Sequence, residues 1–298
     1  MAMPERRVRG IGEAAIQTLE RQRWLEGLGE VLQHAVAATF AAGGDAGRRV
    51  RDALHGTWFG HPLHPALTDI PLGAWTTALV LDATAGHRRG VARAADSAIA
   101  VGIAGAVGAA ATGLTDWHHT VGGDRRVGLG HGLLNTAALT LYVTALTLRR
   151  RGARDLGRGL ATAGFAVALA AAYLGGTLVY KRRIGVDHAP RPEAWEDFVG
   201  VMREADLPEG AARRAVARDV AVVLVRRDGR VYALAESCAH LGGPLSEGRL
   251  EGDAIRCPWH GSRFALENGR VLEGPSTYPQ TCFDVRLREG TIEVRARG

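Results

Sequence analysis

Two short Cys/His pairs constrain this chain more than any other feature. The first is Cys238-Ala239-His240, and the second is Cys257-Pro258-Trp259-His260, with sixteen residues between them. Two thiolates can hold one iron while two imidazole nitrogens hold another, which is the ligand set of a [2Fe–2S] centre of mixed ligation. We therefore expect the two pairs to lie on neighbouring loops between short strands.

Zinc is the other metal that takes both cysteine and histidine. Structural zinc sites more often use paired cysteines two to four residues apart, and Cys-x-His is an unusual first half. Glycines follow both pairs here, at Gly242, Gly243 and Gly261. They allow tight turns with positive φ that point backbone N–H groups at cluster sulfur. The pattern favours iron–sulfur and leaves zinc as the alternative.

The last hundred residues have the period-two pattern of a small all-β domain. Apolar residues alternate or run in short stretches on both sides of Asp228-Gly229, Asn268-Gly269 and Glu289-Gly290. Such dipeptides between apolar runs are typical of β-hairpins. We predict an all-β domain over residues 197–298, with the Cys/His pairs on its loops.

The stretches CAHLGGPLSEG (238–248) and CPWHGSRFALENGRVLEGPS (257–276) closely resemble the Rieske family, and the resemblance extends over residues 197–298. It implies that Cys238 and Cys257 bind one iron. It also implies that His240 and His260 bind the other iron through ring nitrogens, with the histidine edge of the cluster near the surface.

The same resemblance implies roles around the cluster for Gly243, Ser262 and Pro275. Ser262 matches a serine whose hydroxyl bonds a cluster sulfur, and Pro275 belongs to the loop that covers the cluster. High-potential respiratory members carry a disulfide between the ligand loops and a tyrosine where this chain has Phe264. These departures imply a lower potential, as in the ferredoxin-type members that supply oxygenases with electrons.

Composition limits the other functions. The chain has three cysteines, so Cys282 stands alone beside the motif and a disulfide framework is excluded, which fits a reducing compartment. We assign Cys282 no role. The net charge of +6 comes almost wholly from arginine. No basic stripe with interleaved aromatic residues is present, so we predict no nucleic-acid partner.

Four apolar stretches precede the β domain, at residues 65–85, 97–115, 127–148 and 159–180. A bilayer core of about 30 Å needs about 20 such residues in a helix. We predict an all-α membrane domain of four helices over residues 55–183, multi-pass in the cell (inner) membrane, followed by a linker at 184–196. The alternative is a buried bundle of a soluble protein.

Two further segments complete the predicted helical part. Residues 1–54 form an amphipathic helical region, which either packs on the rest of the protein or lies on membrane lipid. Arg6-Arg7 resembles a twin-arginine start, but no apolar stretch follows, so we expect no signal peptide. Residues 55–180, which contain His61-Pro62-Leu63-His64-Pro65, resemble a prokaryotic family of four-helix membrane domains of unknown function with a His-Pro-x-His-Pro motif.

Alternating spans would place several polar side chains at one membrane face: His61, His64, Asp69, His118, His119 and His131. Such residues at helix ends can be solvated or can cap the helices. They can also form a quinone site, a metal site or a haem b site, in which His64 and His131 are the first candidate ligands.

We predict a membrane-anchored electron carrier of ferredoxin type, or an oxidoreductase component, rather than a stand-alone enzyme. The alternatives are a subunit of a membrane oxidoreductase that binds quinone or haem, and a redox-sensing module. Its expected partners are a reductase, an oxygenase or a respiratory component. Arginine and lysine near the span ends number eight on each side, so charge does not set the orientation. We place the Rieske-like domain in the cytoplasm because iron–sulfur proteins are normally loaded before export.

Overall fold

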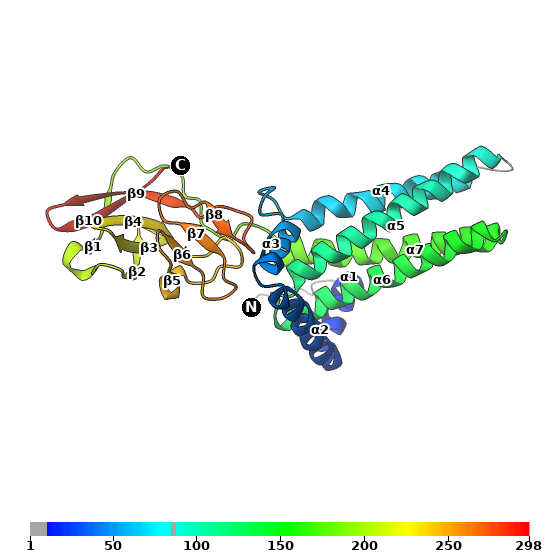
Figure 1. The fold of residues 1–298 in the computed structure, drawn as a ribbon, viewed down its shortest axis with the longest axis horizontal. Coiled ribbons are helices and arrows are strands. Elements are labelled where there is room, and N and C mark those ends of the chain that lie inside the picture. Colours follow the sequence, from blue (N-terminus) through cyan, green and yellow to red (C-terminus); the bar gives the residue numbers. More distant parts are fainter. Residues whose placement is uncertain (1–10, 85–87, 298) are drawn as a thin grey trace, which may run out of the picture. The chain divides into compact units, whose positions relative to one another are not determined.

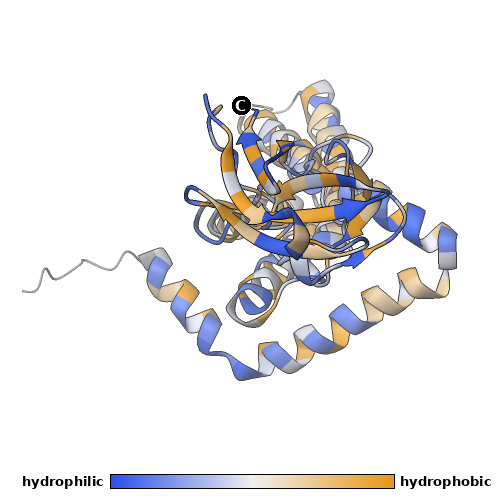
Figure 2. Ribbon diagram, turned by 90° about the vertical axis from the view of Figure 1, so that its left-hand side faces the viewer, coloured by the Kyte–Doolittle hydropathy of each residue, from blue (hydrophilic) through white to orange (hydrophobic). Residues whose placement is uncertain are grey.

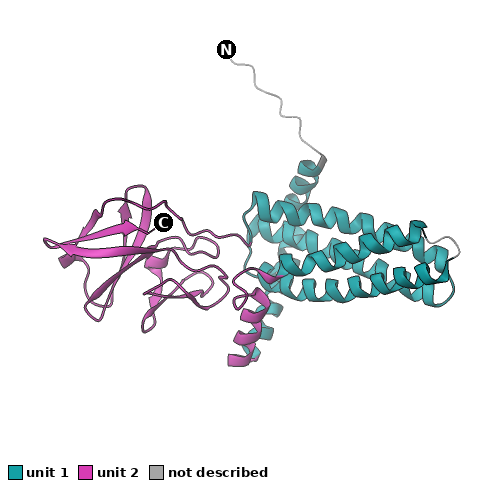
Figure 3. Ribbon diagram, turned by 90° about the horizontal axis from the view of Figure 1, so that it is seen from above, with its two compact units in different colours: residues 1–42, 64–184 teal, residues 43–63, 185–298 magenta. Residues whose placement is uncertain are grey.

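A computed structural model describes residues 11–84 and 88–297. The chain divides into two compact units, one of residues 1–42 and 64–184 and the other of residues 43–63 and 185–298 (Figure 3). The Arg6-Arg7 pair lies outside the described residues. Each unit is described separately below.

The first unit is helical (Figure 1). Its helices are α1 (Ile11–Arg21), α2 (Arg23–Ala42), α4 (Leu63–Thr84), α5 (Arg89–Trp117), α6 (Gly122–Arg150) and α7 (Arg154–Gly176), and α7 continues into a π-helical turn, η1 (Thr177–Lys181). Helices α4 to α7 lie where the four apolar stretches predicted helices. Their buried faces are rich in alanine and glycine, which let helices approach closely.

The four-helix count is not matched. The described N-terminal part contains seven α-helices, because residues 11–55 form α1, α2 and a third helix, α3 (Gly44–His55). By length and composition, two of the described helices could span a membrane: α5, and α7 together with η1. Helix α4 contains two aspartates and an internal proline, and α6 has an aspartate and two arginines near its start and two more arginines at its end.

Helices α1 and α2 pack on the rest of the first unit. Ile16 of α1 is buried against Val127 and Leu174, and Leu25 of α2 is buried with Trp117 and Leu129. These contacts support packing of the amphipathic region on the protein. Figure 2 shows the alternation of charged and apolar residues along these helices.

The second unit contains two antiparallel sheets. A six-stranded sheet has the order β1-β10-β9-β4-β3-β2, and a four-stranded sheet has the order β5-β6-β7-β8. The strands are β1 (Val199–Arg203), β2 (Ala212–Ala217), β3 (Val220–Arg227), β4 (Arg230–Ala235), β5 (Arg249–Leu250), β6 (Ala254–Arg256), β7 (Arg263–Ala265), β8 (Val271–Glu273), β9 (Cys282–Arg288) and β10 (Thr291–Ala296). Short 3-10 turns, η2 (Glu204–Asp206) and η3 (Leu245–Glu247), lie between strands.

The three predicted hairpins are confirmed: β3 pairs with β4, β7 with β8, and β9 with β10. Asp228 and Gly229 have φ values of 50° and 72°, as a tight hairpin turn between twisted strands requires. Apolar residues from both sheets, among them Leu224, Leu234 and Phe264, form one continuous core. This core fixes the strand ends from which the loops with the Cys/His pairs emerge.

Candidate metal centre

The two Cys/His pairs lie on loops with the same backbone hydrogen bonds. In the loop after β4, Cys238 N–H donates to Gly243 O, and Gly242 N–H donates to Cys238 O, both at 2.8 Å. In the loop between β6 and β7, Cys257 N–H donates to Ser262 O at 2.8 Å, and Gly261 N–H donates to Cys257 O at 3.2 Å.

Each of these loops turns at a glycine with a positive φ. Gly242 and Gly261 both have a φ of +79°, a conformation in which a side chain would be strained. A Cβ at Gly243 would lie 3.0 Å from Cys257 Sγ, so the first loop approaches the second loop's sulfur at a residue without a side chain.

The two thiols are buried side by side. Cys238 and Cys257 are 1% and 3% exposed. The hydrogen bond between them raises the pKa of Cys238 well above its ordinary value and lowers the pKa of Cys257 to about 7. Backbone N–H groups of His240 and Leu241 point at the first sulfur, and equivalent N–H groups in the second loop point at Cys257. The glycines in these loops predicted backbone N–H groups directed at sulfur, and such N–H groups are present.

The two imidazoles form the more exposed side of the site. The rings of His240 and His260 lie 5.0 Å apart between centroids, at 88° to each other. Both residues are half-buried, while the cysteines are fully buried. The exposed ring of Trp259 lies 6.3 Å from that of His260. The structure thus gathers the four predicted ligands with the thiols inside and the imidazoles toward solvent.

A third loop, between β8 and β9, holds the second ligand loop in place. It contains Pro275 after a cis peptide bond from Gly274. Ser276 N–H donates to Ser262 Oγ at 2.9 Å, and both serines are buried. Because Ser262 Oγ accepts this bond, its own hydroxyl proton remains available to donate to a neighbouring acceptor.

Gln280 is a positioning residue that the sequence pattern did not reveal. Its side chain is 2% exposed. Its Nε2 donates to Ala235 O and Ser237 O at 2.7 Å, and its Oε1 accepts from Ala239 N–H at 2.9 Å. It therefore fixes the backbone on both sides of Cys238, although forty-two positions separate the two residues in the sequence. No local signal could have identified this contact.

Arg256 is a second such residue. Its guanidinium donates to Gly261 O at 2.8 Å, to both carboxylate oxygens of Glu251, and to Glu273 at 2.9 Å. It thereby connects the second ligand loop with the end of β8. Arg51 of α3 also donates to Glu273, at 3.3 Å. Burial raises the pKa of Glu273, but its hydrogen bond and charge interactions with Arg256 and Arg51 lower it further, so the net shift is downward.

The histidines predicted at the membrane face are only partly brought together. In the first unit, the rings of His64 and His131 lie 6.2 Å apart, and those of His118 and His119 lie 3.7 Å apart. Asp69 is exposed. His61 belongs to the second unit, is exposed, and has its Nδ1 2.9 Å from Pro62 O. Within residues 11–84 and 88–297, no three His, Cys, Asp or Glu side chains are grouped so that they could hold one metal ion.

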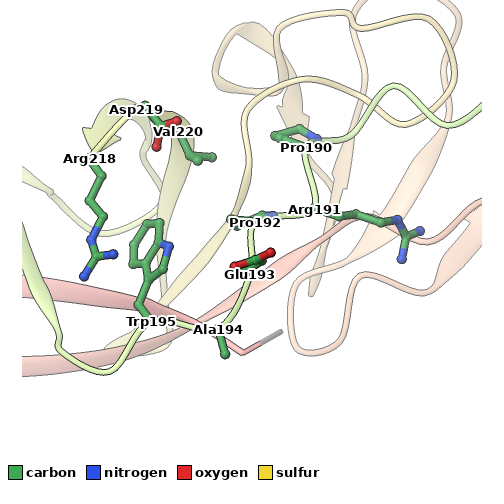
Figure 4. Close-up of a pocket in the computed structure, with 9 residues that line it drawn as sticks. All are labelled: Pro190, Arg191, Pro192, Glu193, Ala194, Trp195, Arg218, Asp219 and Val220. Carbon is green, nitrogen blue, oxygen red and sulfur yellow. The ribbon is translucent and has the colours of Figure 1, made fainter.

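A shallow open cleft in the second unit has none of these residues in its lining (Figure 4). It is formed by the segment 190–195 and the turn at 218–220, and the Arg218 guanidinium lies 4.9 Å above the Trp195 ring. Trp195 packs on the core of the β unit. We assign this cleft a structural role in attaching the linker.

Comparison with known proteins identifies both parts of the chain. Residues 197–284 match the family described as the Rieske [2Fe-2S] domain. Residues 60–188 match a family described as a predicted membrane protein of unknown function (DUF2231). The chain belongs to the Rieske family through its C-terminal domain, which is related to ferredoxins that carry electrons.

The particular relatives are ferredoxins, and one of them is named as a subunit of a dioxygenase. Ferredoxin CarAc of Metapseudomonas resinovorans is 37% identical over 98 residues, which cover 33% of this chain and 92% of the relative. The ferredoxin subunit of 3-phenylpropionate/cinnamic acid dioxygenase from Escherichia coli K12 is 39% identical, over 30% of this chain and 85% of the relative. A solved complex of oxygenase and ferredoxin in carbazole 1,9a-dioxygenase matches with a TM-score of 0.31 and 33% identity, over 33% of this chain and 91% of that one.

Membership in the Rieske family implies a [2Fe–2S] cluster, and the residues present fit one. Two adjacent buried sulfurs, two half-buried imidazoles and a glycine at the point of closest approach are the features that such a cluster needs. Backbone N–H groups aimed at sulfur also favour a negatively charged centre at this place.

Proposed function

We propose that this chain is a membrane-anchored, one-electron carrier of the Rieske ferredoxin type. In this proposal Cys238 and Cys257 bind one iron, and His240 and His260 bind the other. The cluster, when bound, takes up and releases one electron. The matching hydrogen bonds of the two ligand loops are the observation that supports this, together with the burial of both thiols and the approach of the two imidazole rings.

The chain's own residues then have three tasks. The N–H groups of the loops stabilise charge on the cysteine sulfurs. Ser262 offers its hydroxyl proton to the cluster, and the core of the β unit keeps water from the thiol side. The half-buried imidazoles leave the other iron close to solvent, so a docked partner can exchange the electron there.

A decisive test is electron paramagnetic resonance of the dithionite-reduced full chain in detergent. We expect the low average g value that mixed Cys/His ligation gives, and its loss in His240→Ala. A reduced protein without this low-g signal, or a protein that binds zinc in place of iron, would contradict the proposal.

We further propose that helices α4 to α7 anchor the domain, with its cluster in the cytoplasm. The match to a predicted membrane family and the two apolar helices support the anchor. Fractionation should find the full chain in membranes. Protease should remove the C-terminal domain only from vesicles whose cytoplasmic face points outward. Recovery of the full chain in the soluble fraction without detergent would contradict the anchor.

The proposed partners are a reductase as donor and an oxygenase or respiratory component as acceptor. The relative named as a dioxygenase ferredoxin subunit supports an oxygenase as partner. The absence of the two loop cysteines and the presence of Phe264 support a lower potential than that of respiratory members. A redox titration of the cluster tests this expectation directly.

A second candidate function is a subunit of a membrane oxidoreductase whose helical part binds its own redox cofactor, quinone or haem. The approach of His64 to His131 is the specific observation that favours it. An absorption spectrum of the purified chain distinguishes this candidate from a simple anchor.

A further inference from the structure

Helices α4 to α7 contain an internal duplication. Side chains with the same spacing meet across the unit in three layers: His64 with His131, Trp75 with Tyr142, and Asp82 with Arg149. The first member of each pair is on α4 and the second is on α6. The Trp75 and Tyr142 rings stack at 3.9 Å and 11°. The α4–α5 hairpin and the α6–α7 hairpin are therefore two copies of one design.

Helices α5 and α7 repeat the pattern. A Cβ at Gly102 of α5 would lie 2.2 Å from Trp75, and a Cβ at Gly164 of α7 would lie 3.2 Å from Tyr142. These two glycines occupy equivalent positions. In each half of the duplication, the aromatic ring therefore packs on a helix surface that has no side chain at that point.

The two histidines are held in the same way. His64 Nδ1 lies 2.8 Å from Ala109 O of α5, and His131 Nδ1 lies 2.8 Å from Ala171 O of α7. A backbone carbonyl can only accept, so each Nδ1 donates its N–H, and in the neutral imidazole each Nε2 then presents a lone pair. Histidines that bind a metal commonly donate the other ring N–H to a carbonyl in this way.

Glycines also let each imidazole lie directly on its neighbouring helix. A Cβ at Gly113 would lie 2.8 Å from the His64 ring, and a Cβ at Gly175 would lie 3.0 Å from the His131 ring. Each glycine is one turn beyond the alanine whose carbonyl holds that ring. Two independent helix pairs thus orient one imidazole each, and both imidazoles meet at 6.2 Å between centroids and 88°.

We propose that His64 and His131 are the axial ligands of one haem b. Bonds from a metal to imidazole nitrogen are about 2 Å long. With a nitrogen roughly 1 Å from its ring centre, two rings on opposite sides of one iron have centroids about 6 Å apart. The observed 6.2 Å agrees with this value. Helical bundles commonly form cofactor sites from side chains on facing helices.

The number of ligands favours haem over a bare ion. A structural zinc site takes four protein ligands, whereas haem brings four porphyrin nitrogens and needs only two axial ones. Asn135 Nδ2 lies 3.1 Å from His131 Nε2, so the side-chain amide of Asn135 contacts this ring nitrogen. A haem iron at this site would form its bond to that nitrogen in place of the amide contact.

The inference extends the second candidate function and is independent of the Rieske cluster. The test is titration of the full chain in detergent with hemin, followed by absorption spectroscopy and a pyridine haemochromogen assay. We expect one low-spin haem per chain. His64→Ala and His131→Ala should each lower the haem content at least tenfold, while His118→Ala and His119→Ala keep it.

His131→Met provides a readout that does not depend on loss of the haem. A thioether can still bind the iron, and His/Met ligation has a higher reduction potential than two histidines. We expect haem to remain bound with a raised potential and a changed spectrum. The paramagnetic signal of the Rieske cluster, measured in every variant, separates failure of this proposal from failure of the electron-carrier proposal. A native chain that binds no haem would overturn it, as would haem retained unchanged in both alanine variants.

Discussion

The buried side chain of Gln280 offers the sharpest test of how the cluster loops are held. In Gln280→Ala, two carbonyls, Ala235 O and Ser237 O, lose their bonds from Nε2, and Ala239 N–H loses its acceptor. A buried polar group left unpaired costs about 1–3 kcal/mol. With three such groups, and with some relaxation toward water, we expect the second unit to lose about 3–5 kcal/mol of stability.

The assay is guanidinium denaturation of the cluster-loaded chain in detergent, followed by the cluster's visible absorption. A loss of about 3 kcal/mol corresponds to roughly a hundredfold change in the folding equilibrium. We expect both the midpoint of denaturation and the lifetime of the cluster to fall. A loss below about 1 kcal/mol would refute the role assigned to the three hydrogen bonds.

Gln280→Met is the matched control, because methionine fills most of the same volume but makes none of these bonds. We expect it to be almost as unstable as Gln280→Ala. If methionine restores stability, packing at this position explains the effect and the hydrogen bonds do not.

Three shorter predictions concern the same unit. Arg256 and Arg51 lower the pKa of Glu273. The stability that these interactions contribute is therefore present above the ordinary carboxyl pKa and is lost as the pH falls through the lowered value. In Glu273→Gln, cluster retention should vary less with pH between about pH 3 and 6, as measured by absorption. Burial raises the pKa of Cys282 to about 11, so iodoacetamide should label it roughly a hundredfold more slowly at about pH 8 than an ordinary thiol, as followed by mass spectrometry. Phe264 is fully buried beside the ligand loops, and Phe264→Tyr should raise the cluster potential in a redox titration if its hydroxyl donates toward the cluster.

The sequence predicted those parts of the structure that local patterns encode. Turn dipeptides such as Asp228-Gly229 identified the hairpins because their conformation depends on the residues themselves. The Cys/His pairs identified the ligand loops for the same reason. Gln280 and Arg256 were missed because their partners are distant in the sequence or are backbone atoms, and backbone atoms leave no trace in residue identity.

In the helical part, the sequence predicted the helices but not how they are arranged. Composition predicted helices at α4 to α7 but not the grouping of residues 43–63 with the β unit, which includes an ion pair between Arg51 and Glu273. The sequence analysis did not identify the duplication, because some paired positions differ in chemistry, as Asp82 and Arg149 do, although His64 and His131 are identical. The equal spacing and the contacts across the unit reveal it.

The third layer of the duplication contains a buried ion cluster with opposite charges in the two halves. Arg149, whose side chain is fully buried, contacts Asp82 and lies 2.9 Å from Asp96. Removing one member of a buried pair costs about 3–5 kcal/mol where the remaining charge is left unpaired; here Asp96 keeps Arg154 and Asp82 keeps Arg158, so the cost is smaller. We therefore expect Arg149→Met to lower the thermal stability of the helical unit, measured by circular dichroism in detergent.

The double variant Arg149→Met/Asp82→Asn should be more stable than Arg149→Met alone, since it also removes a buried carboxylate that has lost its direct partner and keeps only Arg158, 3.6 Å away. Equal stability of the single and double variants would refute the idea that the weakened pairing of Asp82 causes the loss. The arrangement also selects the correct pairing of the two hairpins. Two copies of the first hairpin would bring Asp82 against Asp82, and two copies of the second would bring Arg149 against Arg149. The charges thus favour association of one half with the other, which is the arrangement that brings His64 to His131.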